Sequence, residues 1–493
     1  MKRTIFVVCL LLFGVALGRA QQFPPSRHIS IDELRAYQLP EVVLESVNHT
    51  ATWVEVKGTI GGAIRFELLL PDNWNNRFVM GGGGGFVGSV QNGARASVSD
   101  GYATVGTDAG HEWPVNYMAG WAYNNLEAKI DFGYLAVHRT AEVAKALIRA
   151  YYGFDPHYSY FIGCSRGGGQ AMMEAQRYPD DFNGIVAGAP AFDWTGFAAN
   201  AVQIEKVLYP DPRHLDHPVL DKKALTILQK AIIDQCDAQD GLKDGIIQDP
   251  PSVHFDLSKV EGLTDDQRKA IEAIYAGVHG SHGQIYPGYT AGAECDPNQW
   301  AAWIVGPIPG LTGHVPDLMF AFGTQIFKFL IFNDPDWDYS TYNFSNFAKD
   351  SELASTFLNA TNFDLYKFQK RNNKLILSHG WADPALPPQA TVNYYRQLRA
   401  SDPNCADYCR LFMIPGCFHC GGGPGAADVN WLGTIVDWVE HAKAPDKVIA
   451  NKAGPDGKLI MTRPLYCYPT VAAYNGSGDP NSADSFGPKP ATH

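Results

Sequence analysis

The strongest constraint on the fold is the segment Gly163-Cys164-Ser165-Arg166-Gly167, which lies between a strand-like and a helix-like stretch. It fits the pattern Gly-x-Ser-x-Gly, in which a serine occupies a sharp turn between a strand and a helix. Glycines are needed on both sides because side chains there would collide in so tight a turn. The pattern predicts that Ser165 is a nucleophile raised above a parallel sheet. An ordinary glycine-rich turn is the alternative.

The rest of the chain alternates between strand-like and helix-like patterns. Strand-like runs occur at residues 60–70, 77–80, 102–106, 158–162, 185–188, 374–378 and 410–414. Helix-like periodicity occurs at residues 130–151, 170–177, 391–398 and 431–441, and also at 222–235 and 265–276. Such alternation predicts a parallel sheet with helices on both faces, but it breaks in the middle of the chain. We therefore expect an α/β-hydrolase core of residues 21–194 and 373–493, with residues 195–372 inserted as a lid.

A nucleophilic serine needs a base, and the base needs a carboxylate that orients it. In an α/β-hydrolase the acid and then the histidine follow the serine, each in a loop after a later strand. Asp383 and His419 each come five residues after one of the last two strand-like runs. The sequence therefore predicts the triad Ser165, Asp383 and His419. The alternative bases are His111 and His379.

Five consecutive glycines, Gly81 to Gly85, follow the strand-like run at residues 77–80. An α/β-hydrolase takes its second oxyanion donor from this position. We expect a backbone amide of Gly83 or Gly84 to act together with that of Arg166. A phosphate-binding loop is the alternative, but the lysine and the serine or threonine that end such a loop are missing.

The first twenty residues, 1–20, have the pattern of a secretory signal peptide. Lys2 and Arg3 precede an apolar run at residues 5–17, and small residues follow, with cleavage expected after Ala20. A membrane anchor is the alternative, but the apolar run is short for a span. The formal net charge of −12 and the lack of a basic cluster argue against nucleic acid as a partner. We expect a secreted or periplasmic protein that does not bind membranes.

All of the nine cysteines except Cys9 lie beyond this leader. The eight that remain are an even number, which in an oxidising compartment favours disulfides. If Ser165 and His419 are hydrogen-bonded, the neighbouring Cys164 and Cys420 lie close enough for a disulfide that clamps nucleophile and base together. A metal cluster of Cys417, His419 and Cys420 is the alternative.

The expected lid contains an acidic loop. Asp237, Asp240 and Asp244 fall within residues 236–246 together with two glycines. Carboxylates at this density, with glycines that let carbonyl groups turn inward, are typical of calcium loops, although the spacing is not that of an EF-hand. From the residues alone, a calcium loop and a solvated acidic turn are equal alternatives.

Several longer blocks resemble the tannase/feruloyl esterase family, which also includes the mono(hydroxyethyl) terephthalate hydrolases. The blocks are residues 132–138 and 158–165, Met173-Glu-Ala-Gln-Arg-Tyr-Pro-Asp-Asp-Phe182, Gly184-Ile-Val-Ala-Gly-Ala-Pro190, His379-Gly-Trp-Ala-Asp383-Pro, and residues 415–420 with the glycines after them. The resemblance implies the triad already predicted and a disulfide between Cys164 and Cys420. It also implies a structural calcium ion in the lid, held by the side chains of Asp237, Asp240 and Asp244 and the carbonyls of Leu242 and Ile246.

The chain departs from the usual pattern of this family. Arg166 directly follows the nucleophile, where a small or polar residue is usual, and Gly169 stands where an arginine is usual. The usual partner of Cys236 is missing near His254, and that of Cys467 is missing near residues 486–487. The pairing of six cysteines therefore stays open, with fifteen possibilities: Cys236, Cys295, Cys405, Cys409, Cys417 and Cys467.

The resemblance also implies the reaction, which is hydrolysis of esters of aromatic acids. A feruloyl esterase is expected first, and a tannase or terephthalate monoester hydrolase is the alternative. The expected partner is a small aromatic ester or a feruloylated polysaccharide fragment, and Arg166 is a candidate for attracting an acidic substrate group. Aromatic residues of the lid are candidates for stacking on the acid: Trp300, Phe320, Phe322 and Phe327. A catalytically silent, calcium-stabilised binding protein and a metal-dependent hydrolase are the alternatives from other classes.

Overall fold

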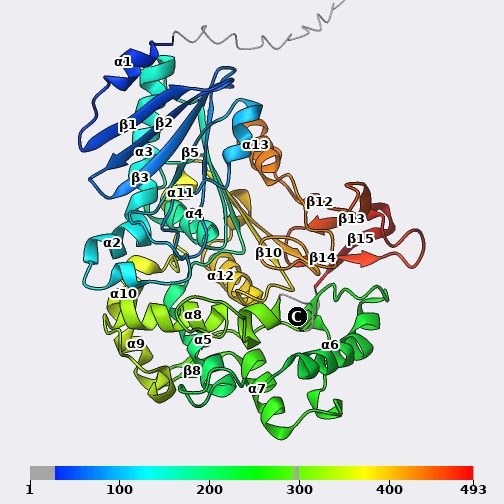
Figure 1. Cartoon of the computed structure of the whole chain (residues 1–493). Helices are drawn as coiled ribbons and strands as arrows, with labels where there is room; N and C mark the ends of the chain where they lie inside the picture. Colours follow the sequence, from blue (N-terminus) through cyan, green and yellow to red (C-terminus); the bar gives the residue numbers. More distant parts are fainter. Residues whose placement is uncertain (1–27, 293, 295–298, 492–493) are drawn as a thin grey trace, which may run out of the picture.

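A nine-stranded sheet in the order β1-β2-β3-β5-β4-β6-β7-β10-β11 runs through the molecule (Figure 1). The computed structural model describes residues 28–292, 294 and 299–491, so the predicted signal peptide and Cys295 lie outside the described residues. The strands are β1 (Val42–His49), β2 (Trp53–Ile60), β3 (Ile64–Pro71), β4 (Arg77–Gly81), β5 (Ala103–Thr107), β6 (Tyr158–Cys164), β7 (Gly184–Gly188), β10 (Lys374–Gly380) and β11 (Cys409–Ile414). The strand expected at residues 60–70 is β3 alone, because Gly61 and Gly62 turn the chain with φ of 61° and 81°.

In the sheet order from β5 to β11, neighbouring strands are parallel. The pairs β1–β2, β2–β3 and β3–β5 are antiparallel. Alternate residues of the parallel strands are buried on opposite faces. Leu375 and Leu377 of β10 join the larger core, and Ile376 joins the smaller one. The larger core contains residues of α3 (Ala136–Tyr152), α4 (Arg166–Arg177) and α12 (Pro388–Ser401), and the smaller one those of α13 (Trp431–His441). This arrangement confirms the predicted α/β class.

The periodicity predicted for residues 130–151 forms two helices joined by a π-helical turn. These are α2 (Leu126–Ile130), the turn Asp131–Leu135, and α3. Residues of α3 spaced three or four apart are buried, as expected for one apolar face. The helix ends at Gly153, whose φ of 86° satisfies the left-handed end of a helix.

Most of the chain between β7 and β10 forms a group of helices in the lower part of Figure 1, drawn in green and yellow, whereas α11 is labelled higher, beside α4. Its elements are α5 (Trp194–Leu208), α6 (Lys222–Cys236), α7 (Asp265–Ala276), β8 (Val278–Gly280), β9 (Gly283–Tyr286), α8 (Leu318–Gln325), α9 (Phe347–Asp350), α10 (Glu352–Leu358) and α11 (Tyr366–Lys370). The helix α7 begins at a capping box, in which Thr264 and Gln267 each accept a backbone N–H of the other. The strands β8 and β9 pair only with each other, so this segment adds no strand to the large sheet.

Two hairpins that the sequence did not predict follow α13. They consist of β12 (Lys447–Ala453) with β13 (Leu459–Tyr466), and β14 (Thr470–Tyr474) with β15 (Phe486–Pro490). A short helix, α1 (Ile31–Arg35), begins the described chain.

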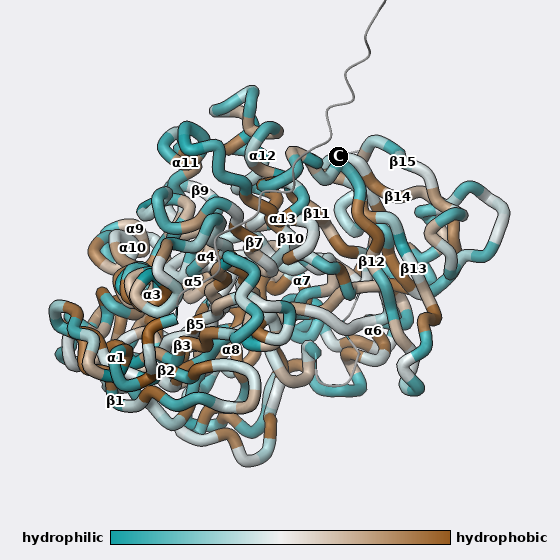
Figure 2. Tube along the Cα trace, turned by 90° about the horizontal axis from the view of Figure 1, so that it is seen from above, coloured by the Kyte–Doolittle hydropathy of each residue, from teal (hydrophilic) through white to brown (hydrophobic). Residues whose placement is uncertain are grey.

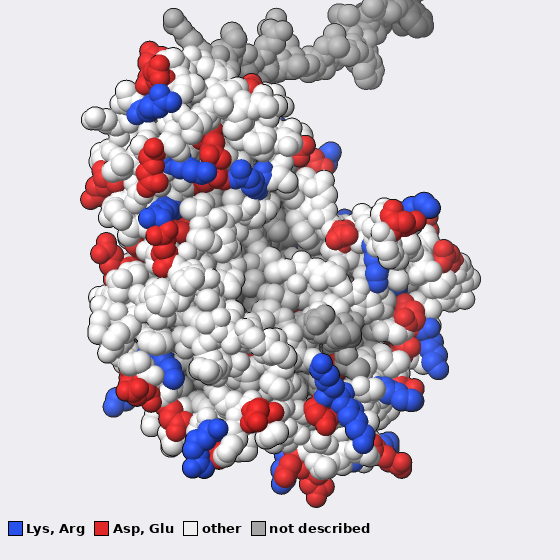
Figure 3. Space-filling model, viewed as in Figure 1, with Lys and Arg blue, Asp and Glu red and all other residues white. Residues whose placement is uncertain are grey.

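Hydrophobic segments gather around the central strands in Figure 2, and the outer loops are mostly hydrophilic. On the face drawn in Figure 3, charged side chains lie mainly around the periphery, and the central part is largely uncharged. No helix among the described residues combines the length and apolarity that crossing a membrane requires.

Candidate active site

Ser165 lies on the turn between β6 and α4, at the carboxyl end of a central strand. Its backbone has φ 62° and ψ −123°, a conformation that is strained for any residue other than glycine and is found mostly at functional sites. The N–H of Ser165 donates to the carbonyl of Gly188 (3.0 Å), and its own carbonyl accepts from Gly169 (3.0 Å) and Ala191 (2.9 Å). These bonds hold Ser165 in the strained turn that the motif predicts.

Close approach of backbones explains the glycines around this turn. A Cβ atom added to Gly163 would lie 2.4 Å from the backbone of Gly167, and one added to Gly82 would lie 2.5 Å from the Cα of Gly167. Non-bonded carbon atoms are normally about 3.5–4.0 Å apart, so neither position can carry a side chain. The glycine-rich run after β4 therefore lies directly against the serine turn.

Asp383 and His419 come together on the loops that follow β10 and β11. Nδ1 of His419 is 2.8 Å from Oδ2 of Asp383. Oδ1 of Asp383 accepts the backbone N–H groups of Ala385 (2.8 Å) and Leu386 (3.0 Å). Burial would raise the pKa of Asp383, but its interactions with His419 and His379 together lower the pKa below its usual value. The carboxylate is therefore ionised at neutral pH and leaves Nε2 as the basic nitrogen of His419.

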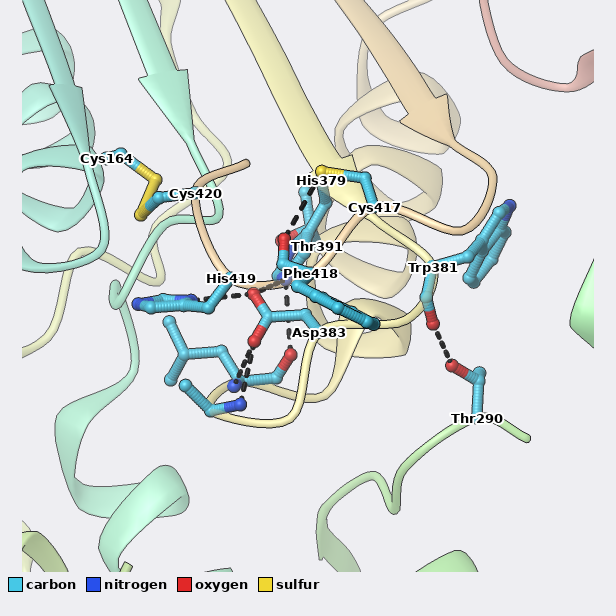
Figure 4. A network of polar contacts seen from close by, with 12 residues as sticks. Cys164, Thr290, His379, Trp381, Asp383, Thr391, Cys417, Phe418, His419 and Cys420 are labelled. Carbon is cyan, nitrogen blue, oxygen red and sulfur yellow. Dashed lines mark hydrogen bonds and ion pairs between the residues drawn. A yellow bond between two sulfur atoms is a disulfide. The ribbon is translucent and has the colours of Figure 1, made fainter. Parts of the chain in front are cut away.

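The disulfide expected between Cys164 and Cys420 is present, and Figure 4 shows it beside His419. It joins residues 256 positions apart in the chain, one directly before Ser165 and the other directly after His419. The alternative metal cluster is wrong because Cys420 is in the disulfide, and the thiol of Cys417 donates to the carbonyl of Phe418 (3.3 Å).

Ser165 and His419 line one cavity of about 1080 Å³. The walls combine the glycine loop after β4, the loops after β10 and β11, and side chains of the inserted segment. A volume of this size accommodates an aromatic acyl group together with the alcohol to which it is esterified.

Most of the aromatic residues expected to stack on a substrate are core residues. Phe322 lines the cavity, whereas the others are buried and do not line it: Trp300, Phe320 and Phe327. Trp303 lines the cavity instead, and the sequence analysis missed it. Its ring centroid lies 5.3 Å from that of His419 in a T-shaped contact and 6.3 Å from that of Phe322 in a stacked one.

The side chain of Arg166 lies in the core and not in the cavity, so the suggestion that it attracts an acidic substrate group is wrong. It is 1% exposed, and its guanidinium donates to the carbonyls of Phe132 and Gly133. The guanidinium carbon also lies 4.1 Å from the ring centroid of Phe132 and 5.5 Å from that of Trp194. Burial lowers the pKa of Arg166 to about 9. The role of its backbone amide in the oxyanion hole stays a prediction.

The predicted oxyanion donors of the glycine loop already have acceptors. The N–H of Gly83 donates to Oε1 of Gln170 (3.1 Å), and that of Gly84 donates to Oε1 of Gln91 (2.8 Å). Each of these hydrogen bonds must break before the glycine amide can donate to an oxyanion instead. The role of Gly83 or Gly84 stays a prediction, and the sequence analysis missed both glutamines.

Comparison with known proteins identifies the family. The family model described as tannase and feruloyl esterase matches residues 48–488. The chain belongs to this family. It is 32% identical over 487 residues to the mono(2-hydroxyethyl) terephthalate hydrolase of Piscinibacter sakaiensis, covering 86% of this chain and 81% of the relative. It is also 32% identical over 467 residues to a probable feruloyl esterase of Arthroderma benhamiae, with coverages of 90% and 84%.

A solved structure confirms the fold of this tannase/feruloyl esterase family member. The feruloyl esterase B from Aspergillus oryzae superposes with a TM-score of 0.81 at 26% sequence identity. The superposition covers 93% of this chain and 100% of the Aspergillus oryzae chain. The α/β-hydrolase fold predicted from the sequence is therefore confirmed.

The acidic loop predicted to bind calcium in this family follows α6. Asp237 accepts the N–H of Gly245 (2.9 Å), and Asp244 accepts from the guanidinium of Arg463 (3.1 Å). Burial, reinforced by the charges of the neighbouring aspartates, raises the pKa of both Asp237 and Asp240. The donors are of the hard oxygen type that calcium prefers, but among the described residues their carboxylates do not form a close cluster of ligand atoms, so the calcium site stays a prediction. Arg463 already compensates part of the charge.

A different group meets the distance requirement for a metal cluster among the described residues. Ligand atoms of His138, Glu174 and Asp181 lie within 4.8 Å of one another. Nζ of Lys145 is 3.8 Å from Asp181, and burial together with the charge of Asp181 raises the pKa of Glu174 well above its usual value. The raised pKa of Glu174 and the neighbouring Lys145 both reduce the negative charge of this cluster.

The other described cysteines carry no disulfide: Cys236, Cys405, Cys409, Cys417 and Cys467. Sγ of Cys236 lies 3.7 Å from the carbonyl oxygen of His254. His254 therefore lies beside Cys236, where the resemblance led us to expect a partner cysteine.

Proposed function

We propose that this chain is a secreted serine esterase that hydrolyses esters of aromatic acids. Ser165 is the nucleophile, His419 the base, and Asp383 the carboxylate that orients the base. The observation that carries the proposal is the meeting of the strained Ser165 turn and the Asp383-bound His419 at one cavity, tied together by the disulfide. Membership of a family whose relatives are named feruloyl esterase and terephthalate hydrolase supports ester hydrolysis.

The reaction proceeds by acyl transfer in two steps. Nε2 of His419 takes the proton of the Ser165 hydroxyl as the oxygen attacks the ester carbonyl, and the imidazolium is stabilised by Asp383. The backbone N–H of Arg166, the first residue of α4, is a donor to the oxyanion. Collapse of the tetrahedral intermediate releases the alcohol, which takes its proton from His419. Water then attacks the acyl-serine with His419 as base, which releases the acid and regenerates Ser165.

The cavity favours an acyl group without charge. Within the described part of the chain, no lysine, arginine, aspartate or glutamate lines it, and Trp303 and Phe322 supply aromatic walls. A feruloyl or galloyl group is neutral at pH 7, whereas a terephthalate monoester carries a carboxylate. Burying that carboxylate without a cation is unfavourable. We therefore propose feruloyl esters, including feruloylated polysaccharide fragments, as first substrates, galloyl esters next, and terephthalate monoesters last.

Calcium and export complete the proposal. The side chains of Asp237, Asp240 and Asp244, with carbonyls of the same loop, would hold a structural calcium ion, and no step of the reaction uses it. The charged, apolar and small-residue pattern of residues 1–20 supports export to the cell exterior or the periplasm. The disulfide agrees with an oxidising compartment.

Initial rates on methyl ferulate, methyl gallate and a terephthalate monoester test this proposal. We expect methyl ferulate to be hydrolysed fastest, and Ser165→Ala to lower turnover by about a thousandfold or more. Ser258→Ala, at an exposed serine of the inserted segment, is the control and should keep full activity. Hydrolysis that survives in folded Ser165→Ala would refute the triad.

Two other outcomes would favour the alternative classes. A wild-type protein that hydrolyses no aryl ester would be the silent binding protein. Loss of turnover on chelation, while the protein stays folded, would indicate a metal-dependent hydrolase.

A further inference from the structure

The carboxylate of Asp383 binds two histidines, and the reaction described above uses only one of them. Nε2 of His379 lies 3.1 Å from Oδ2 of Asp383, the same oxygen that His419 approaches at 2.8 Å. Figure 4 shows the two rings on different sides of the carboxylate. His379 is 2% exposed and lies at the end of β10, so it is part of the rigid sheet.

The contacts of His379 determine which of its nitrogens carries the proton. Nε2 faces two acceptors, Oδ2 of Asp383 and the carbonyl of Leu386 (3.2 Å), and so must donate. Nδ1 lies 2.8 Å from the hydroxyl of Thr391 on α12, which can donate to it. This pattern describes a neutral imidazole with its proton on Nε2. His379 is therefore a hydrogen-bond donor in place and not an alternative base.

We propose that His379 is a positioning residue for the esterase reaction. Backbone N–H groups hold Oδ1 of Asp383, and the N–H of His379 holds Oδ2 from the side opposite to His419. Without His379 the carboxylate is free to turn about its last bond, so Oδ2 keeps its contact with Nδ1 of His419 but holds the imidazole in a less fixed direction. The inference rests on the proposed triad and adds a fourth residue that acts through Asp383.

The donor also affects proton transfer. Two N–H groups share the charge on Oδ2, so each is bound less strongly than if it were alone. Removing the N–H of His379 leaves more charge for the imidazolium of His419. The acid limb of the pH profile should then move to higher pH, because the protonated base becomes more stable.

Other titratable groups near Asp383 do not change over this pH range. Tyr286 and Tyr289 of the inserted segment interact with its charge, as does Cys417 of the His419 loop. Burial raises the pKa of both tyrosines well above the usual value and that of Cys417 to about 12. All three stay neutral where an esterase is assayed.

Two substitutions of His379 separate positioning from packing. His379→Leu places an apolar side chain of similar size at this position and removes the donor. His379→Gln instead supplies an N–H near the position of Nε2. For His379→Leu we expect kcat on methyl ferulate to fall about 10- to 100-fold, with KM within about twofold and the acid limb moved to higher pH. His379→Gln should recover most of kcat and the wild-type pH profile.

The chain offers a control in a second, partly buried histidine–aspartate pair. Nδ1 of His138 is 2.6 Å from Oδ2 of Asp181, and neither residue lines the cavity. His138→Leu loses the same type of contact as His379→Leu. Because this pair does not line the cavity, kcat and the pH profile at 25 °C should match those of the wild type even if the thermal midpoint falls.

Three results would overturn the inference for a folded protein. These are a His379→Leu variant with wild-type kcat, equal losses in His379→Leu and His379→Gln, and a loss of kcat with an unmoved pH profile. Ser165→Ala is assayed in the same series. Activity in that variant would remove the triad itself, whereas the three results above remove only the role of His379.

Discussion

Breaking the disulfide between Cys164 and Cys420 tests whether the nucleophile turn and the base loop depend on a covalent link. The double variant Cys164→Ser, Cys420→Ser removes the bond and leaves no thiol at either position. The His419 loop is also held by hydrogen bonds, among them that of His419 to Asp383 and those of Lys452 to the carbonyls of Gly423 and Pro424. It contains a glycine-rich stretch in which Gly421, Gly422 and Gly423 all have positive φ. Such a stretch has more freedom to lose on folding than one with side chains.

The size of the stability effect follows from the length of the loop that the bond closes. The cysteines are 256 positions apart, and the chain-entropy relation for so long a loop gives roughly 5 kcal/mol at 25 °C as an upper value. A protein of 493 residues has an unfolding entropy of about 1 kcal/mol per kelvin, so the thermal midpoint should fall by about 5 °C. A displacement of about 1 Å between His419 and Ser165 would also lower kcat by up to a hundredfold.

Thermal unfolding and methyl ferulate hydrolysis at 25 °C measure the two effects separately. We expect the double variant to lose both midpoint and kcat, with little change in KM. Cys467→Ser removes a free, partly buried thiol away from the site and should change neither. A double variant with the wild-type midpoint and the wild-type kcat would refute the reasoning, because non-covalent contacts alone would then hold the loop. A lower midpoint with unchanged kcat would limit the bond to a stabilising role.

Three further predictions concern parts of the fold outside the triad. Burial, with the charge of Glu127, raises the pKa of Asp131 to about 6. The neutral carboxyl therefore stabilises the fold at low pH, and this contribution, at most about 3 kcal/mol, is lost as the pH rises from about 4 to 6. The thermal midpoint of Asp131→Asn should not show this loss over the same pH range. Chelation of calcium should lower the thermal midpoint of the wild type but hardly that of Asp240→Asn, and turnover of the folded enzyme should persist in both. His254→Cys should form a disulfide with Cys236, which is 18 positions away. The bond should stabilise the fold by at most about 3 kcal/mol, seen as a higher thermal midpoint, and a reductant should reverse the gain.

Much of the fold was predictable because its signals are local. The helices α7 and α13 have the limits expected from the sequence, and each begins beside a side chain that caps the helix, Thr264 and Asn430. The order of strands and helices was sufficient to place Asp383 and His419 after the last two parallel strands. The hairpins after α13 were missed because apolar residues do not alternate with polar ones in their strands. Burial alternates along β12, but apolar Ile449 is exposed between the buried Val448 and Ala450, and in β13 the buried residues are consecutive.

The unpredicted parts of the site depend on contacts between distant residues. Gln170 is 87 positions from the Gly83 amide that it binds, and no sequence pattern near either residue predicts this hydrogen bond. Trp303 and Trp300 are both aromatic residues of the same inserted segment, yet only Trp303 lines the cavity. Which of them faces a substrate depends on how the segment packs against the sheet, and periodicity alone does not contain that information.

Arg166 and His379 illustrate how the same kind of evidence can mislead in opposite directions. Arg166 adjoins the nucleophile in sequence, which suggested a role toward substrate, but the first turn of α4 directs its side chain to Phe132 and Trp194. His379 was only an alternative base in the sequence analysis, yet the turn after β10 brings the carboxylate that orients His419 back to it. Sequence order identifies residues that can do chemistry, whereas the direction of a side chain decides whether they do so by touching the substrate or by holding another residue in place.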